Sequence, residues 1–226
     1  MTHEAKEPCR VILARHGQTE WNKEFRFQGR TNVQLTEEGK RQAHALSERL
    51  SSWPPDVIYT SPLDRALYTA QAIADRHNMK PVILDELEEI NFASWEGESI
   101  AGLEREQHEI FSHWREDPFF NPPEGAETWD TLSERLTRAV NKMLEGGHKR
   151  IIAVSHGGIM RALYAVFTGL NPHKTWNMDV SNCSISGVEM RNGRACLAFT
   201  NDDLHIRAGA YGEKLPVWGT SYEPRA

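Results

Sequence analysis

The sequence predicts an α/β fold with three layers, in which a mostly parallel central sheet is covered by helices on both faces. Short apolar runs with the length of buried strands alternate with segments whose apolar residues recur at helical spacing. The chain has 226 residues, which is enough for one well-buried domain. We predict this domain over residues 9–205, between an N-terminal tail of residues 1–8 and a C-terminal tail of residues 206–226.

The first strand is predicted over residues 11–14, and it ends in Arg15, His16 and Gly17. Buried strands do not usually finish with a cation beside an imidazole, so this end of the strand is a candidate for function. Gly17 allows the backbone to approach a neighbouring segment closely. The polar residues 17–34 predict a loop.

A helix, a strand and a second helix are expected next. Thr36 precedes two glutamates, which is typical of the start of a helix, and apolar residues recur after it at helical spacing. A proline-rich turn leads to a strand at residues 56–60, and Ser61 opens a helix with one apolar face. Residues 80–87 predict a further strand.

Residues 98–127 are polar and aromatic and end in the loop signal "NPPEG". We interpret this segment as an insertion that could act as a lid and select the substrate. Its aromatic side chains could instead pack the insertion against the sheet, because aromatic residues mainly supply buried apolar area. The residues concerned are Phe111, His113, Trp114, Phe119 and Phe120.

The remaining elements complete the alternation. A helix from residue 129 stops at Gly146 and Gly147, and an apolar strand ending in "VSHGG" is followed by a helix that Gly169 ends. Two late strands, near residues 183–190 and 194–200, flank an "RNG" turn and could form a hairpin.

Composition argues against several classes of function. The net charge of −6, from 32 acidic and 26 basic side chains, does not favour binding to nucleic acid or to a membrane surface, so positive charge for an anionic substrate must be local. No apolar run approaches the roughly 20 residues that span a bilayer. The charged N-terminus lacks an apolar signal core, and we expect a cytoplasmic protein, with a homodimer as one possibility. Three widely spaced cysteines are expected to be reduced packing residues: Cys9, Cys183 and Cys196.

Two predicted strands end in the same way. "VILARHGQ" and "IIAVSHGG" are apolar runs that finish in His-Gly, at His16 and His156. Side chains just beyond the carboxyl ends of parallel strands face the ligand crevice of an open sheet. Both imidazoles are therefore candidates for one cleft, although either one alone could be a packing or capping residue.

Two further segments carry chemistry to the same edge. In "YTSPLDRA" the strand ends at Thr60, and the first turn of the next helix carries Arg65, where backbone N–H groups and the helix dipole favour anions. In "LDELEEINFASWEG" a strand runs into a loop with Glu88 and Glu89, and spacing alone does not choose between them.

Taken together, Arg15-His16-Gly17, "SPLDRA", "LEEINFASWEG" and "VSHGG", in this order, resemble the histidine phosphatase superfamily. That superfamily includes the cofactor-dependent phosphoglycerate mutases and many small-molecule phosphatases. The resemblance covers about residues 10–200 and implies a phosphoglycerate mutase-like fold. It implies a phosphatase that acts on a small phosphoester without a metal or another cofactor.

The resemblance also implies roles for individual residues. His16 is expected to be the nucleophile that takes the phosphoryl group, and Glu89 the proton donor to the leaving oxygen. Arg15, Arg65 and His156 are expected to surround the phosphoryl oxygens. Further contacts to phosphate or substrate are expected from Asn22, Gln28, Gly29 and Gly157.

The chemistry of these residue types agrees with the resemblance. Phosphoryl transfer needs an in-line nucleophile and stabilisation of the charge on the equatorial oxygens. An imidazole can attack at neutral pH when one ring nitrogen is free and the other is held by a partner. Arginine matches phosphate oxygens bidentately. The sequence departs from the family pattern at Gln18, Asn32, Gln34 and Ala93, and Ala93 lies in the loop of Glu89.

Other functions are weighed on the same residues. A phosphoglycerate mutase is the alternative, but residues 98–127, where such mutases are expected to hold a carboxylate with basic side chains, contain eight acidic and only two basic residues. A sensor without catalysis should have lost His16, Glu89 or an arginine. A metal site at His16 and His156 lacks a nearby cluster of carboxylate or cysteine ligands. We therefore favour the phosphatase.

Overall fold

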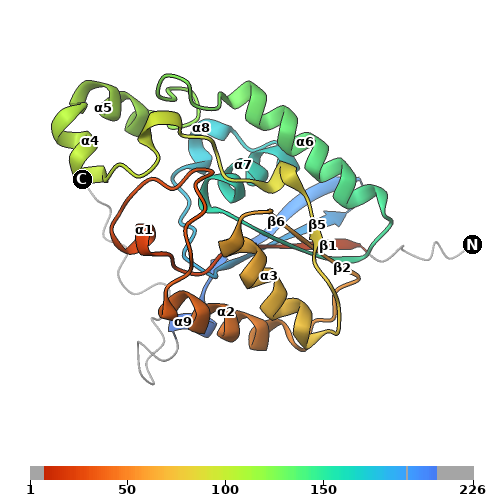
Figure 1. The fold of residues 1–226 in the computed structure, drawn as a ribbon. Helices are drawn as coiled ribbons and strands as arrows, with labels where there is room; N and C mark the ends of the chain where they lie inside the picture. The colour runs from red at the N-terminus through yellow and green to blue at the C-terminus, as the bar shows by residue number, and fades with distance from the viewer. Residues whose placement is uncertain (1–7, 192, 208–226) are drawn as a thin grey trace, which may run out of the picture.

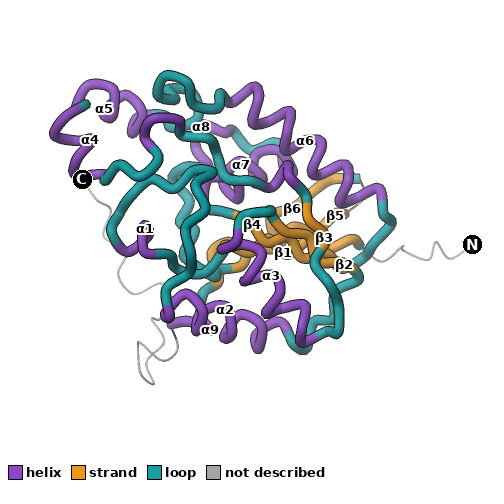
Figure 2. Tube along the Cα trace, in the orientation of Figure 1, coloured by secondary structure: helices purple, strands orange, loops and turns teal. Residues whose placement is uncertain are grey.

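A computed structural model describes residues 8–191 and 193–207, and Figures 1 and 2 show their arrangement. The strands of the sheet lie in the order β3-β2-β4-β1-β5-β6. β1 to β4 are parallel to one another, and β5 and β6 are antiparallel to their neighbours. The strands are β1 (Cys9–Arg15), β2 (Val57–Thr60), β3 (Val82–Ile83), β4 (Arg150–Ser155), β5 (Ile185–Arg191) and β6 (Arg194–Asp202).

Helices cover both faces of this sheet, which confirms the predicted three-layer α/β fold (Figure 1). Helices α2 and α3 lie on one side, and α6 and α7 on the other. The α-helices are α1 (Glu20–Lys23), α2 (Glu37–Leu50), α3 (Asp64–Arg76), α4 (Ile100–Glu106), α5 (His108–Glu116), α6 (Trp129–Glu145), α7 (Gly157–Thr168), α8 (Pro172–Thr175) and α9 (Leu204–Arg207). Within the described ranges, no helix combines the length and the apolar character that crossing a bilayer demands.

The apolar runs form central strands because both of their faces are buried. Successive side chains of a strand point to opposite faces, so Ile12 and Ala14 pack with α2 and α3, whereas Val11 and Leu13 pack with α6 and α7. A run without polar alternation is thus satisfied only in the middle of a covered sheet.

The ends of the central strands are aligned, and this alignment forms the site. Arg15 of β1 lies opposite Ser155 of β4, and Thr60 of β2 lies opposite Val154. The next residue after each strand therefore emerges at the same edge of the sheet (Figure 2). These residues are His16, Ser61 and His156.

Gly17 makes the close approach that its residue type suggested. A Cβ atom on Gly17 would lie 2.4 Å from the carbonyl oxygen of Gly39 in α2. The start of α2 is fixed in the same region, because Thr36 Oγ1 accepts a hydrogen bond from the Gly39 N–H, as expected for an N-cap residue.

Three local features differ from the sequence prediction. Residues 98–127 contain α4, which begins after Ser99, and α5, which begins at His108. Ser99 Oγ accepts a hydrogen bond from the Gly102 N–H at the start of α4. The strand expected over residues 80–87 is limited to Val82–Ile83, because a 3-10 helix (Asp85–Leu87) follows at once. Helix α9 continues to residue 207, two residues past the expected domain end, and residues 208–226 of the expected tail lie outside the described residues.

Candidate active site

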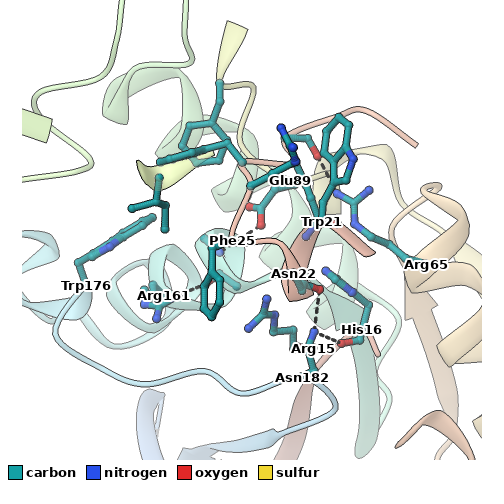
Figure 3. Close-up of a pocket in the computed structure, with 18 of the residues that line it drawn as sticks. Arg15, His16, Trp21, Asn22, Phe25, Arg65, Glu89, Arg161, Trp176 and Asn182 are labelled. Atoms are coloured by element: carbon teal, nitrogen blue, oxygen red, sulfur yellow. Dashed lines mark hydrogen bonds between the residues drawn. The ribbon is translucent and has the colours of Figure 1, made fainter. Parts of the chain in front are cut away.

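A pocket of about 380 Å³ lies at the carboxyl end of the central strands, and Figure 3 shows the side chains that line it. It gathers residues from the end of β1, the loop after it, the acid loop near residue 89 and the starts of α3 and α7. Eight of the nine site residues predicted from the sequence line its wall: Arg15, His16, Asn22, Gln28, Gly29, Arg65, Glu89 and Gly157.

His16 lies at the floor of the pocket with one ring nitrogen fixed. Its Nδ1 lies 2.7 Å from the carbonyl oxygen of Gly17, so Nδ1 carries the proton and donates, and Nε2 keeps its lone pair. Burial, followed by the charges of Arg65 and Arg15, holds the pKa of His16 well below its usual value. The ring is therefore neutral at pH 7, which is the form that can act as a nucleophile.

His156 lies beside His16, with 5.1 Å between the ring centroids. It is fully buried and is the one predicted site residue that does not reach the pocket wall. Its Nε2 shares a 2.8 Å hydrogen bond with Ser61 Oγ, and its Nδ1 has no hydrogen-bond partner among residues 8–191 and 193–207. Burial, and then the charges of Arg65, His16 and Arg15, hold the pKa of His156 well below its usual value.

The two predicted arginines are anchored by backbone carbonyls. Arg15 Nη1 donates to the Val180 carbonyl oxygen at 2.6 Å, and the two terminal nitrogens of Arg65 donate to the carbonyl oxygens of Thr31 and Gly29 at 2.8 and 2.7 Å. Burial lowers the pKa of each arginine to about 10, which leaves both charged at neutral pH. The buried Nε of each has no hydrogen-bond partner in the described part of the chain.

Glu89 faces the pocket from the loop that follows β3. Its Oε1 accepts from the Ile90 N–H at 3.0 Å, and its Oε2 accepts from the Gly158 N–H at 3.3 Å, at the start of α7. The structure thereby distinguishes it from Glu88, which is paired with Arg30. A Cβ on Gly158 would lie 2.7 Å from Glu89 Oε1, so the carboxylate reaches this position only because residue 158 is glycine.

Three residues predicted as further contacts to phosphate or substrate, Asn22, Gln28 and Gly29, line the pocket. Asn22 Oδ1 accepts from the Thr19 backbone and from Asn182 Nδ2, so its amide nitrogen is left toward the pocket. Gln28 Oε1 accepts from Thr19 Oγ1 at 2.8 Å. Gly29 has a φ of 51°, and its carbonyl oxygen holds Arg65.

Gly157 lies between two arginines. A Cβ at this position would lie 3.4 Å from Arg161 Nη1 and 3.5 Å from Arg15 Nε. Arg161 was not predicted from the sequence. Its signal is its place one helical turn after Gly157 in "GGIMR", which directs the side chain back toward the start of α7.

Other pocket residues were also missed, and they come from segments without a motif. Asn182 donates to the carbonyl oxygen of His16 at 3.2 Å. The outer wall is formed by apolar and aromatic side chains: Trp21, Phe25, Phe92, Ile100, Trp114 and Trp176. Of the five aromatic residues considered for a lid, Phe111, Trp114 and Phe119 are buried in an aromatic cluster, and only Trp114 lines the pocket.

The described residues offer no support for a metal site. Over residues 8–191 and 193–207, no group of three or more His, Cys, Asp or Glu side chains is arranged to hold a metal ion. Cys9, Cys183 and Cys196 are free thiols, and burial raises the pKa of Cys183.

Comparisons with known proteins agree with this geometry. The chain is 33% identical over 202 residues to phosphoserine phosphatase 1 of Hydrogenobacter thermophilus. The aligned region covers 87% of this chain and 94% of that relative. It is 35% identical over 161 residues to phosphoglycerate mutase-like protein 4 of Arabidopsis thaliana, covering 68% and 69% of the two chains. A mycobacterial glucosyl-3-phosphoglycerate phosphatase, solved as a complex with VO3, superposes with a TM-score of 0.80 at 26% identity over 85% of this chain and 99% of its own.

The family model described as "Histidine phosphatase superfamily (branch 1)" matches residues 11–203, which includes every predicted site residue. The match spans most of the chain, and the relatives are covered almost end to end or over two thirds of their length. This chain belongs to branch 1 of the histidine phosphatase superfamily.

Proposed function

We propose that this chain hydrolyses phosphomonoesters of small metabolites through a phosphohistidine at His16. One observation carries the proposal: a neutral imidazole with a free Nε2 lies at the floor of a pocket beside Arg15 and Arg65. Neither arginine is ion-paired within the described residues, so an incoming phosphoryl group would supply the missing negative charge.

In the first step, His16 Nε2 attacks phosphorus in line with the leaving oxygen. A P–N bond forms, the P–O bond to the alcohol breaks, and Glu89 gives its proton to the leaving oxygen. The N–H groups of Arg15 and Arg65 stabilise the charge on the equatorial oxygens. His156 Nδ1, which lacks a partner among the described residues, is the proposed donor to a further phosphoryl oxygen.

In the second step, water attacks the phosphohistidine from the side that the alcohol has left. Glu89, now a carboxylate, accepts a proton from this water, the P–N bond breaks and inorganic phosphate is released. His16 returns to the neutral form with its Nδ1–H held by the Gly17 carbonyl oxygen.

Hydrolysis is favoured over phosphoglycerate mutation by the charges of residues 98–127. Arg105 and Arg115 are exposed and form ion pairs with Glu106 and Glu104, and neither lines the pocket. This segment therefore offers no unpaired cation, within the described residues, for the carboxylate of a phosphoglycerate held in the mutase manner.

The test is hydrolysis of a chromogenic aryl phosphate with and without a chelator. We expect turnover that resists the chelator and is lost in His16→Ala. Glu89→Gln should accumulate an acid-labile phosphoryl group on the protein, because an aryl leaving group needs little protonation whereas the water still needs a base. No turnover of any phosphoester by the purified chain would contradict the proposal.

A cytoplasmic location and a homodimer are proposed from the sequence alone. Cell fractionation tests the first. Sedimentation of the purified full chain at several concentrations tests the second, and a single species with the mass of one chain would rule it out.

A further inference from the structure

Four arginines that are buried or half-buried fall into two groups. Arg135 in α6 is 8% exposed, and it is paired with the buried carboxylate of Glu127 at 2.7 Å. Arg15, Arg65 and Arg161 line the pocket, and in the described ranges none of them forms an ion pair with a carboxylate. Because buried charges in proteins are usually paired, the missing negative charge of the pocket is expected from a ligand.

Arg161 is held rigidly by the protein. Its Nε donates to the Met178 carbonyl oxygen at 2.9 Å, and its Nη1 donates to the Gly157 carbonyl oxygen at 3.1 Å. Its guanidinium carbon lies 5.1 Å from the ring centroid of Trp176. Nη2 makes no hydrogen bond in the part of the chain that the structure describes, and this donor is left for the pocket.

Arg161 lies on a different side of the pocket from His16 and Arg65. Figure 3 shows Arg161 and Trp176 on one side, next to Phe25, and His16 with Arg65 on the other. Burial, and then the charges of Arg65 and Arg15, lower the pKa of His16, and Arg161 is not among these causes. Arg161 lies nearer to Arg15, because burial and then the charge of Arg161 lower the pKa of Arg15.

The charge balance points to a single negative charge on the leaving group. When Glu89 carries the proton that it will donate, the three arginines bring three positive charges, and a phosphoryl dianion neutralises two of them. One positive charge remains, and Arg161 is the arginine on the leaving-group side. The outer wall is apolar, with Phe25, Ile100, Trp114 and Trp176, and it would oppose a second highly hydrated phosphate.

We infer that Arg161, stacked on Trp176, binds a carboxylate carried by the alcohol part of the substrate. This inference rests on the proposed function, because it assigns the leaving-group side of the same pocket. A planar carboxylate matches the fork of a guanidinium, and the contact is charge-assisted. Arg161 is thus a specificity-determining residue, separate from the residues that hold the phosphoryl group.

The test compares two small phosphomonoesters that differ by one group, namely 3-phosphoglycerate, which has a carboxylate, and glycerol 3-phosphate, which has a hydroxymethyl group there. We expect the wild-type kcat/KM to be higher for the carboxylate by roughly 10- to 100-fold, the size of a hydrogen bond to a charged group. In Arg161→Gln this ratio should fall close to one, and Arg161→Lys should keep an intermediate ratio.

Arg26→Gln is the matched control. Arg26 also lines the pocket, but it is exposed and already paired with Glu24 at 2.6 Å, so the ratio between the two substrates should not change. Thermal unfolding of each variant separates a folding defect from a change of specificity. The ratio of kcat/KM for the two substrates in the wild type tests the inference even if a variant fails to fold.

The outcomes separate this inference from the proposed function. Hydrolysis of an aryl phosphate with equal kcat/KM for the two small substrates overturns the carboxylate subsite and leaves the phosphatase standing. An equal loss for both substrates in Arg161→Gln assigns Arg161 to the phosphoryl group instead, which also overturns it. Absence of all phosphoester hydrolysis removes the proposed function and this inference with it.

Discussion

Replacing Ser61 with alanine should disturb the site through the fully buried ring of His156. Ser61 Oγ lies 2.8 Å from His156 Nε2, and both residues are fully buried. Within residues 8–191 and 193–207, Nδ1 of the same ring already has no partner. In Ser61→Ala, the imidazole would therefore lose its only hydrogen bond from the described residues.

The magnitude follows from burial. A buried polar group left without a partner costs about 1–3 kcal/mol, so we expect the free energy of unfolding to fall by that amount. The Leu63 N–H, which donates to Ser61 Oγ at 3.3 Å, loses a long hydrogen bond and adds little. Because the ring is no longer held in one orientation, kcat/KM should fall by up to roughly 100-fold.

Urea unfolding and steady-state hydrolysis of an aryl phosphate measure the two effects. Ser184→Ala is the matched control, because Ser184 Oγ is also buried but has no hydrogen-bond partner among the described residues. We expect this control to stay within about 0.5 kcal/mol of the wild type. A Ser61→Ala protein with unchanged stability and unchanged kcat/KM would refute the assignment of Ser61 as the residue that positions His156.

Three further predictions concern stability, each measured by urea unfolding. Burial and the neighbouring arginines hold the pKa of His16 and His156 low, so below about pH 6.5 the unfolded chain binds more protons than the folded chain. As the pH falls below this value, the free energy of unfolding should decrease by about 1.4 kcal/mol per pH unit for each of the two rings. His16→Gln should remove the contribution of one ring and so halve this slope. In Gly17→Ala the new Cβ meets the Gly39 carbonyl oxygen at 2.4 Å, which should cost about 1–3 kcal/mol. Ala93 has a φ of 51°, so Ala93→Gly should gain up to about 1 kcal/mol.

Each of these has a result that would contradict it. The account of the histidines fails if wild type and His16→Gln lose stability in parallel between about pH 6.5 and about pH 5. A Gly17→Ala protein as stable as the wild type would mean that α2 moves freely away from the first strand. Loss of stability in Ala93→Gly would mean that the alanine side chain contributes more than its left-handed backbone costs.

Much of the fold was predictable because its signals are local. An apolar run such as residues 11–14 can be buried on both faces only inside a covered sheet, and the structure confirms that fold class. Helix starts were predictable where a capping side chain precedes the helix, as at Thr36. The helices α4 and α5 were not predicted, and the apolar face of α5 is completed by contacts of Phe111 with the distant rings of Phe27 and Trp95.

The site was predictable only in part. The His-Gly ends of two strands and the arginine after a third indicated one edge of the sheet, because parallel strands present their carboxyl ends together. Spacing could not choose between Glu88 and Glu89. The place of Arg161 one helical turn after Gly157 directs its side chain toward the start of α7, but this place alone does not show that the side chain reaches the pocket. Each choice depends on what faces the side chain across the pocket.

The sequence by itself determined which segments are buried strands, where several helices begin and which reactive side chains follow a strand. Only the tertiary structure decided that His156 packs beside His16 and shares a hydrogen bond with Ser61. It also decided that Arg161 lies over the ring of Trp176 without a carboxylate partner among the described residues. The physical reason is that propensity and periodicity act over a few neighbouring residues. Strand order and register, in contrast, set the distances between side chains more than a hundred positions apart.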